Sequence, residues 1–323
     1  MDTVEKLKQQ VLEGALLNRE QALLLAQEPL EPLCRAADEI RQAFCRNAFD
    51  LCTIINGKCG RCSEDCKYCA QSMHYQTQIE EYPLLDTDEI VKQAEENARR
   101  GVLRYSIVTS GRRLGQGEIE KVCESIRAIR QKGNIEVCVS FGLLNEEDFR
   151  KIKAAGASRV HCNLETSRDY FSKVCTTHSY DEKIETLKAA RRAGLSVCSG
   201  GIMGLGETRE DRIDMALTLR ELGVKSIPVN FLNPIKGTPY EHNPLLSDEE
   251  KRRVIAVFRF LLPDASVRLA GGRGLIADKG EACFLSGANA AISGDMLTTA
   301  GITVETDRRL LEKLGYEVRL FNE

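Results

Sequence analysis

The sequence predicts an α/β fold in which eight β-strands alternate with helices. Short runs rich in β-branched and apolar residues recur from about residue 48, and helical patterns separate most of them. This alternation is typical of parallel β/α units, and the 323 residues suffice to close eight units into a (β/α)8 barrel of the TIM type. The expected strands are 50–56, 104–110, 135–141, 159–165, 195–201, 226–232, 266–270 and 289–293.

The helices between the strands have recognisable ends. Helical patterns at 86–100, 146–155 and 180–193 are each followed directly by a glycine. Glycine after the last periodic residue is a typical helix C-terminal signal. An open doubly wound sheet is the alternative for the same alternation. No G-x-G-x-x-G follows the first strand, which disfavours a dinucleotide-binding version of that sheet.

Residues 1–47 carry a separate pattern of short helical runs. Pro29 and Pro32 interrupt this pattern before its third run. We expect residues 1–47 to form an N-terminal helical cap, and residues 48–323 to form the barrel together with a C-terminal segment. No linker rich in glycine, serine or proline separates the two parts.

Composition restricts the kind of protein. The chain has 45 basic and 48 acidic residues, a net charge of −3 and a hydrophobic fraction of 42%. These values are typical of a globular protein and give no electrostatic reason to expect nucleic acid or an anionic membrane as a partner. No apolar run approaches the length of about 18 residues that crosses a bilayer, and the first residues are charged where a signal peptide is apolar. We therefore expect a cytoplasmic protein without membrane partners.

Thirteen cysteines are unusual for such a chain. In a reducing cytoplasm, closely spaced thiols indicate metal binding or catalysis rather than disulfides. The densest group is CGRCSEDCKYC at 59–69, in the loop expected after the first strand, and barrel enzymes carry their chemistry at the C-terminal ends of the strands. Six cysteines show no ligand spacing and are expected to be structural thiols: Cys34, Cys45, Cys123, Cys162, Cys175 and Cys283.

Within the dense group, Cys62, Cys66 and Cys69 have the spacing C-x3-C-x2-C. Three thiolates can hold three irons of a [4Fe–4S] cube and leave the fourth iron open, where S-adenosylmethionine (SAM) can bind through its amino and carboxylate groups. An electron passed through the cube then cleaves SAM to a 5′-deoxyadenosyl radical, which removes hydrogen from unactivated carbon. Adding Cys59 gives four thiolates, which suit a structural zinc or a ferredoxin-like cluster, although structural zinc usually has a longer connection between its cysteine pairs. We expect Cys59 to be a spare thiol.

Alternation along the expected strands gathers polar side chains on one face. His161, Asn163 and Glu165 share one face of the fourth expected strand, and Cys162 lies on the other. Every second residue of a barrel strand faces the interior, and a purely structural interior would be aliphatic. We therefore expect the barrel to hold a polar ligand. Other members of the expected inward set are Cys52, Cys138, Ser140, Cys198, Ser226, Pro228, Asn230 and Arg268.

The triplet Cys62, Cys66 and Cys69 resembles the signature of the radical SAM superfamily, and further motifs resemble those of the biotin synthase family within it. The resemblance covers about residues 40–320 and is specific, because several separated motifs agree in order and spacing. The motifs are CSEDCKYCAQS at 62–72, NLETS at 163–167, VCSGGIMGLGE at 197–207, KGTP at 236–239, VRLAGGR at 267–273 and GAN at 287–289.

The resemblance implies the activity of that family, which is the insertion of sulfur into dethiobiotin to form biotin. It implies SAM and an open [4Fe–4S] cube as cofactors, a second, auxiliary iron–sulfur cluster as sulfur donor, a flavodoxin- or ferredoxin-type reductant, and a homodimer. Cys62, Cys66 and Cys69 are then the catalytic ligands of the cube. The residues implied to bind SAM are Tyr68, Asn163, Glu165 and Met203, and those implied to bind dethiobiotin are Asn163, Asn230, Thr298 and Thr299.

In the family, three strand cysteines and an arginine hold the auxiliary cluster. Cys138, Cys198 and Arg268 match three of these positions, and Arg268 is implied to be catalytic as well. Ser106 stands where a cysteine is expected and is a poor ligand for a soft metal. Our hypothesis is that Cys52, on the neighbouring strand, supplies the missing thiolate to a four-iron cluster with an extra sulfide rather than to a [2Fe–2S] cluster. The alternative is that Cys52 is a small buried core residue.

Two other functions fit parts of the pattern. A related radical SAM enzyme, such as a hydrogenase maturase or a methylornithine synthase, shares the barrel and the cysteine triplet without inserting sulfur. Cys138, Cys198 and Arg268 together disfavour it, and the serine at position 106 favours it. A non-catalytic iron–sulfur carrier or zinc-binding protein explains the cysteine loop without a substrate pocket, and cleavage of SAM by the reduced protein excludes that reading.

Overall fold

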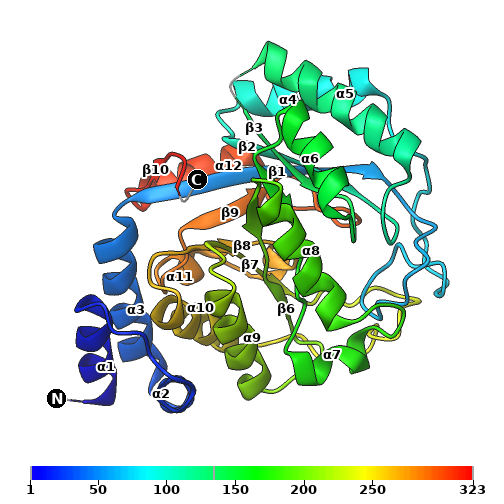
Figure 1. The fold of residues 1–323 in the computed structure, drawn as a ribbon. Helices are drawn as coiled ribbons and strands as arrows, with labels where there is room; N and C mark the ends of the chain where they lie inside the picture. Colours follow the sequence, from blue (N-terminus) through cyan, green and yellow to red (C-terminus); the bar gives the residue numbers. More distant parts are fainter. Residues whose placement is uncertain (1, 134, 322–323) are drawn as a thin grey trace.

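The computed structural model describes residues 2–133 and 135–321, and its centre is a closed parallel barrel (Figure 1). Each barrel strand pairs in parallel with the next, and the last pairs with the first, which closes the ring. The predicted eight-stranded TIM-type barrel is confirmed, and the open sheet is excluded. The barrel strands are β1 (Ala48–Lys58), β2 (Arg104–Thr109), β3 (Glu136–Ser140), β4 (Arg159–His161), β5 (Ser196–Cys198), β7 (Ser226–Phe231), β8 (Ser266–Leu269) and β9 (Ala290–Ser293).

Two of the predicted strands, the fourth and the fifth, are less than half as long in the structure as predicted. The fifth is interrupted after Cys198 and resumes as β6 (Gly201–Met203), which pairs with β7. At Gly201 the chain also forms a parallel bridge with Glu165, and the approach is close, since a Cβ added to Gly201 would lie 2.4 Å from the carbonyl oxygen of Glu165. The fourth ends at His161, and Glu165 itself has a left-handed backbone with φ +70°, which a strand does not accommodate. The prediction that β4 extends to Glu165 is therefore wrong.

Helices surround the barrel (Figure 1). The predicted helices 86–100, 146–155 and 180–193 are confirmed as α4 (Thr87–Arg99), α6 (Glu146–Ala155) and α8 (Tyr180–Arg192). Sequence signals fix their ends: the Asn145 side chain caps α6 by accepting from the Asp148 amide, and Gly156 ends that helix in the left-handed conformation. The other outer elements are α5 (Gln116–Lys132), α7 (Arg168–Val174), α9 (Arg209–Glu221), α10 (Asp248–Leu261), η1 (Arg273–Leu275), α11 (Glu281–Phe284) and α12 (Val304–Lys313).

The two ends of the chain add elements to the barrel. Three N-terminal helices, α1 (Thr3–Leu12), α2 (Arg19–Leu25) and α3 (Leu30–Cys45), lie together beside α9 and α10 (Figure 1). Their apolar side chains belong to the same continuous core as those of the barrel. At the other end, β10 (Glu317–Val318) pairs in parallel with the start of β1.

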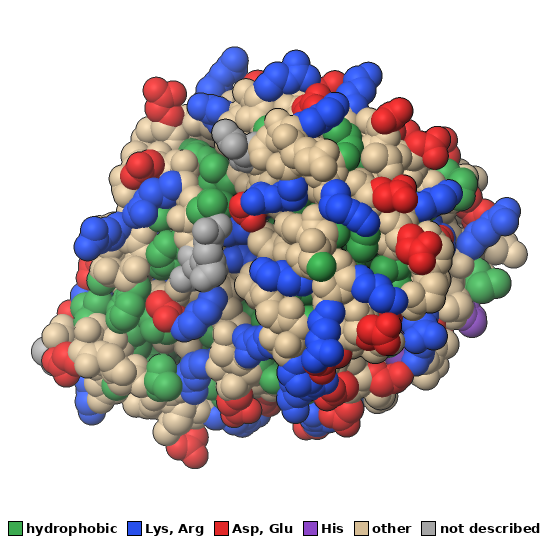
Figure 2. All heavy atoms as spheres, turned by 45° about the horizontal axis from the view of Figure 1, so that its top comes forward, with side chains coloured by type: hydrophobic (Ala, Val, Ile, Leu, Met, Phe, Trp, Pro, Cys, Tyr) green, Lys and Arg blue, Asp and Glu red, His purple; other side chains and the backbone are tan. Residues whose placement is uncertain are grey.

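The outer surface carries charges of both signs. Figure 2 shows lysine and arginine side chains interspersed with aspartate and glutamate over one face of the molecule, as the near-balanced composition predicts. Within the described residues, no helix is both long enough and apolar enough to cross a membrane.

Candidate active site

The barrel encloses a cavity of about 400 Å³ whose wall includes side chains from all eight barrel strands. The polar inward set predicted from strand alternation lines this cavity, from Cys52 on β1 to Arg268 on β8. Cys162 lines it as well, although alternation predicts it on the outer face. The chain leaves the strand geometry after His161, so the period of two no longer holds there.

The cysteine loop closes one side of the cavity directly after β1, as predicted. Cys62, Cys66 and Cys69 are half-buried and line the cavity wall. Backbone hydrogen bonds curl the loop: the Cys62 amide donates to the Gln71 carbonyl over 3.0 Å, and the Cys69 amide donates to the Cys66 carbonyl over 2.9 Å. A further amide, that of Lys67, donates to the chain at the end of α7. The loop therefore places its three thiols on the wall of one cavity.

Cys59 lies apart from the other three cysteines of the loop. Its backbone exchanges hydrogen bonds of 3.1 and 3.2 Å with Tyr82 in an antiparallel bridge. It is buried, and it does not belong to the cavity wall. This separation disfavours a single four-thiolate metal site and agrees with the expectation of a spare thiol.

Two residues expected to contact SAM meet at the cavity wall. Glu165 is buried, its Oε1 lies 3.8 Å from Nζ of Lys183, and its Oε2 has no hydrogen-bond partner within the described residues. Burial and the neighbouring Glu165 carboxylate raise the pKa of Tyr68 well above its usual value, so the phenol is neutral. The cavity wall therefore offers a hydrogen-bond acceptor, Oε2 of Glu165, to a ligand, and the uncharged ring of Tyr68 lies on the same wall.

The other two expected SAM contacts differ from each other. Asn163 lines the cavity, and its Oδ1 accepts from the Gly200 amide over 3.1 Å. Met203 is almost fully buried in the main core, and its neighbour Ile202 lines the cavity instead. The structure therefore does not bring the Met203 side chain to the site.

The residues expected to contact dethiobiotin line the same cavity. Asn230 on β7 donates through Nδ2 to the Gly201 carbonyl over 3.0 Å and accepts at Oδ1 from the Gly271 amide over 2.8 Å. Since a primary amide has two donors and two acceptor positions, one of each is left for a ligand. Thr298 and Thr299 line the cavity in the loop after β9.

Three thiols lie deeper in the barrel. Cys52 on β1, Cys138 on β3 and Cys198 on β5 are buried and line the cavity, as does Ser106 on β2. Ser106 is in register with Cys138 on one side and with Ile54 on the other, so Cys52 lies one inward step below Ser106 on the neighbouring strand. The thiol of Cys52 is therefore close to position 106, where a cysteine was expected and the chain has a serine.

The charges around these thiols differ. Burial raises the pKa of Cys52 above its usual range, and burial also raises the pKa of Cys138. Burial acts in the same direction on Cys198, but His161 together with the charges of Arg268 and Arg159 outweighs it and lowers the pKa of this thiol to about 7. The hydroxyl of Ser226 also donates to the Cys198 sulfur over 3.2 Å.

A network of four charges forms the floor beneath the thiols. The carboxylate of Asp50 is fully buried and lies 3.0 Å from Nε of Arg104, 3.1 Å from Nη2 of Arg268 and 3.9 Å from Nη1 of Arg159. Burial opposes ionisation of Asp50, but the positive charges of Arg268 and Arg104 outweigh it and lower the pKa of this carboxyl. Three guanidinium groups thus surround one buried carboxylate at the base of the barrel.

Sequence reasoning assigned no role to Asp50, Arg104 or Arg159. The signal for all three was strand phase, because each stands two residues before an inward residue: Cys52, Ser106 and His161. The alternation that predicted the inward thiols therefore also predicts that Asp50, Arg104 and Arg159 face inward.

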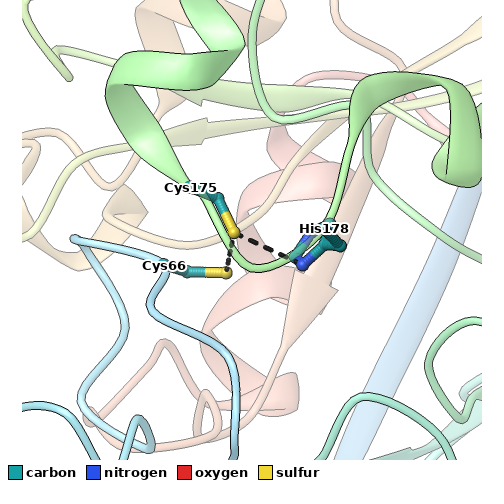
Figure 3. Close-up of side chains that lie close together, drawn as sticks. All are labelled: Cys66, Cys175 and His178. Carbon is teal, nitrogen blue, oxygen red and sulfur yellow. Dashed lines mark hydrogen bonds between the residues drawn. The ribbon is translucent and has the colours of Figure 1, made fainter.

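A second group missed from the sequence surrounds Cys66 (Figure 3). The Cys175 sulfur lies 3.7 Å from the Cys66 sulfur and 3.3 Å from Nδ1 of His178. That nitrogen lies 2.6 Å from Oε2 of Glu64. Cys175 was expected to be a structural thiol because 109 residues separate it from Cys66, a distance at which sequence spacing carries no information. The loop after α7 brings the two together.

A closed parallel barrel with three cysteines in the loop after its first strand defines a radical SAM protein. The family model described as the Radical SAM superfamily matches residues 58–219, and that of the Biotin and Thiamin Synthesis associated domain matches residues 228–317. Biotin synthases of Brachyspira hyodysenteriae and Akkermansia muciniphila are 56% and 55% identical to the chain, over 98% and 99% of its length and 96% and 100% of theirs. The chain belongs to the biotin synthase family.

Solved structures with the same fold include other radical SAM enzymes. A methylornithine synthase matches with a TM-score of 0.84 at 20% identity over 97% of both chains. A maturase of the [FeFe]-hydrogenase matches with a TM-score of 0.82 at 19% identity, over 97% of this chain and 74% of its own. At this identity the likeness shows the shared fold alone. The biotin synthase relatives share far more of the sequence, so the alternative of a maturase or a methylornithine synthase is not favoured.

Proposed function

We propose that the protein inserts sulfur into dethiobiotin to form biotin, with SAM and a [4Fe–4S] cube in the upper part of the cavity and a sulfur-donating cluster at its base. The observation that carries this proposal is that one continuous cavity contains both the cysteine loop and the three deep thiols above their arginine floor. A substrate between the two can then face a radical source on one side and a sulfur source on the other.

The residues around the cysteine loop, which form the upper cavity, suit the [4Fe–4S] cube and SAM. Cys62, Cys66 and Cys69 supply three thiols to one wall, which suits a cube with one open iron. The buried Oε2 of Glu165 needs a donor, and a hydroxyl such as that of the SAM ribose provides one. Tyr68 contributes an aromatic surface at the same wall.

The residues around the three deep thiols, which form the lower cavity, suit the sulfur-donating cluster. Cys52, Cys138 and Cys198 supply three thiolates, and a cluster that binds three thiolates is anionic. The guanidinium group of Arg268, on the same cavity wall, is a cation that suits such a cluster. Nη1 of Arg268 donates to the Asp50 and Ala291 carbonyls, and Nη2 faces the Asp50 carboxylate, so this side chain supports the cluster through its charge. Three thiolates leave room for a fourth iron with a non-protein ligand, which favours a four-iron cluster with an extra sulfide.

The chain's own groups hold and orient the reactants. When bound, the cube with SAM supplies a 5′-deoxyadenosyl radical, and the auxiliary cluster supplies the sulfur atom. Asn230 offers its remaining donor and acceptor to the ureido ring of dethiobiotin, and Thr298 and Thr299 offer hydroxyls to its carboxylate. The barrel wall separates the reacting carbon from water, which protects a radical from side reactions.

Iron analysis of a Cys52→Ala variant tests the assignment of the deep cluster. The unaltered protein and the Cys52→Ala variant are both reconstituted without oxygen. Their iron and sulfide content, Mössbauer spectra, SAM cleavage and biotin formation are then measured. We expect Cys52→Ala to lose the auxiliary iron and biotin formation but to keep reductive SAM cleavage. The matched control is Cys123→Ala, a buried thiol on α5 outside the cavity, which keeps both clusters. An unchanged auxiliary spectrum in Cys52→Ala contradicts the role of Cys52.

The family resemblance supports two further proposals, a flavodoxin- or ferredoxin-type reductant and a homodimer. From the sequence pattern and composition we also propose that residues 1–47 act as a cap on the barrel and that the protein is cytoplasmic. The thirteen thiols suit a reducing compartment. Sedimentation of the full chain tests the homodimer, since a monomer at micromolar concentration contradicts it.

A further inference from the structure

Cys66, Cys175 and His178 form a compact group beside the cavity (Figure 3). Their two sulfurs and one ring nitrogen all lie within 4.8 Å of one another, and across residues 2–133 and 135–321 this is the one set of three such ligand atoms that does so. Cys62 and Cys69 are not in it. The group thus differs from the triplet that the sequence motif defines, although Cys66 belongs to both.

The separations in the group agree with those of a tetrahedral metal site. With metal–sulfur bonds of about 2.3 Å and metal–nitrogen bonds of about 2.0–2.1 Å, tetrahedral angles place two sulfurs about 3.8 Å apart and a sulfur and a nitrogen about 3.6 Å apart. The structure has 3.7 Å between Cys66 and Cys175 and 3.3 Å between Cys175 and Nδ1 of His178. These two separations are therefore close to those that a single ion requires, and the third, between Cys66 and His178, lies within 4.8 Å.

Neighbouring groups hold these side chains in place. The Cys175 amide donates to the Phe171 carbonyl over 3.1 Å at the end of α7, and the Phe171 ring packs against the edge of the His178 ring. Cys175 and His178 are both buried. Because their positions are fixed by packing, little ordering entropy is lost when an ion binds.

A carboxylate lies beside the imidazole of the group. Glu64 Oε2 lies 2.6 Å from Nδ1 of His178, and Arg112 Nη1 lies 3.1 Å from the same oxygen. Glu64 does not belong to the set of ligand atoms within 4.8 Å of one another, so the fourth position of a tetrahedral ion is left to a water molecule. Two thiolates and an imidazole give a donor set typical of zinc and other thiophilic divalent ions, and the two thiolates balance the charge of the ion.

We propose that the cluster-free protein binds one thiophilic divalent cation, such as Zn²⁺ or Fe²⁺, through Cys66, Cys175 and His178, with a water molecule in the fourth position. Binding replaces the protons of the two thiols, which pass to the solvent. The binding itself does not depend on the proposed function. One consequence does rest on it: if Cys66 is a ligand of the cube, a bound ion and the cube exclude each other.

Cobalt binding to the full-length, cluster-free chain tests the site. Co²⁺ in a tetrahedral thiolate site absorbs visible light, so titration without oxygen reports both affinity and geometry, and Zn²⁺ then displaces the signal. We expect one Co²⁺ per chain with a tetrahedral thiolate spectrum. Cys175→Ser and His178→Gln should each weaken the binding by at least tenfold.

The motif cysteines outside the group provide matched controls. Cys62→Ser and Cys69→Ser should bind Co²⁺ as the unaltered chain does, because neither sulfur belongs to the group. Loss of binding in Cys62→Ser with full binding in Cys175→Ser assigns the ion to the motif loop and overturns the proposal. Circular dichroism checks the fold of each variant, and if Cys175→Ser does not fold, full binding by a folded His178→Gln overturns the proposal by itself.

Competition with cluster assembly tests the shared ligand separately. The zinc-loaded chain and the metal-free chain are supplied with iron and sulfide, and formation of the cube is followed by its absorption and electron paramagnetic resonance. We expect zinc to slow cube formation in the unaltered chain and not in Cys175→Ser. If zinc binds as proposed but does not slow the cube, the metal site stands and the assignment of Cys66 to the cube is wrong.

Discussion

Asp50 and Arg268 form a fully buried ion pair at the base of the barrel, with 3.1 Å between Oδ1 and Nη2, and Nη1 of Arg268 donates a hydrogen bond of 2.9 Å to the Asp50 carbonyl. The same carboxylate also faces Arg104 and Arg159. One anion thus holds three cations at a depth where water does not screen them. Its removal affects the fold and the deep thiols together.

We predict that Asp50→Asn is strongly destabilising. Removing one partner from a buried charge network costs about 3–5 kcal/mol, because the remaining charges stay buried without compensation. Chemical unfolding of the two proteins under anaerobic conditions measures the difference. Asp214→Asn is the matched control: Asp214 pairs with Arg19 at the exposed surface over 2.6 Å, and loss of such a pair costs about 0–1 kcal/mol. Equal losses in the two variants contradict the prediction.

The stability provided by Asp50 depends on pH in a defined direction. Its pKa is lowered in the folded protein, so its contribution is complete above the pKa of about 4 for an unfolded carboxyl and is lost as the pH falls through the lower, folded value. We expect the difference in unfolding free energy between the unaltered chain and Asp50→Asn to be constant from pH 7 to about 5 and to shrink below about 4. A difference that grows on acidification contradicts the sign.

Glu165 gives a prediction for the upper cavity. Its Oε2 is buried with no partner among the described residues, and a hydrogen bond to a charged group contributes about 1.5–3 kcal/mol. We expect Glu165→Gln to weaken SAM binding to the reconstituted protein by at least tenfold, measured by equilibrium dialysis. Glu185→Gln, on the exposed side of α8, serves as control and should leave the affinity unchanged. Unchanged affinity in Glu165→Gln removes this residue from the SAM site.

Local patterns predicted the barrel because its strands and helices repeat with constant periods. The helices α4, α6 and α8 agree with prediction within one residue at each end, since glycine, asparagine and serine mark their ends in the sequence itself. The break after Cys198 was not predictable in this way. It accompanies a bridge between Gly201 and Glu165, which is a contact between two separate segments.

The site was predicted to a similar extent and for similar reasons. Alternation on single strands predicted that Cys138, Asn163 and Arg268 face one cavity. It gave no information on which residues meet across strands, so the pairing of Asp50 with Arg268 was missed. The proximity of Cys175 to Cys66 depends on two loops that have no regular period, and only the folded chain reveals it.

The neighbouring positions of Cys52 and Ser106 lead to a rescue experiment. If Cys52 supplies the thiolate that position 106 lacks, a cysteine at position 106 should replace it, because the two positions lie on paired strands one inward step apart and both line the cavity. We expect Cys52→Ala combined with Ser106→Cys to regain the auxiliary iron that Cys52→Ala loses, with a changed Mössbauer spectrum because the ligand set has moved.

The control for this rescue is Cys52→Ala combined with Ser140→Cys. Ser140 also lines the cavity on β3, but it is two residues beyond Cys138 toward the end of the strand, so a sulfur there is farther from the arginine floor. We expect no recovery of auxiliary iron in this protein. Equal recovery with Ser140→Cys and with Ser106→Cys means that any added thiol in the cavity captures iron. In that case Cys52 has no special relation to position 106, because the strand register alone distinguishes the two added cysteines.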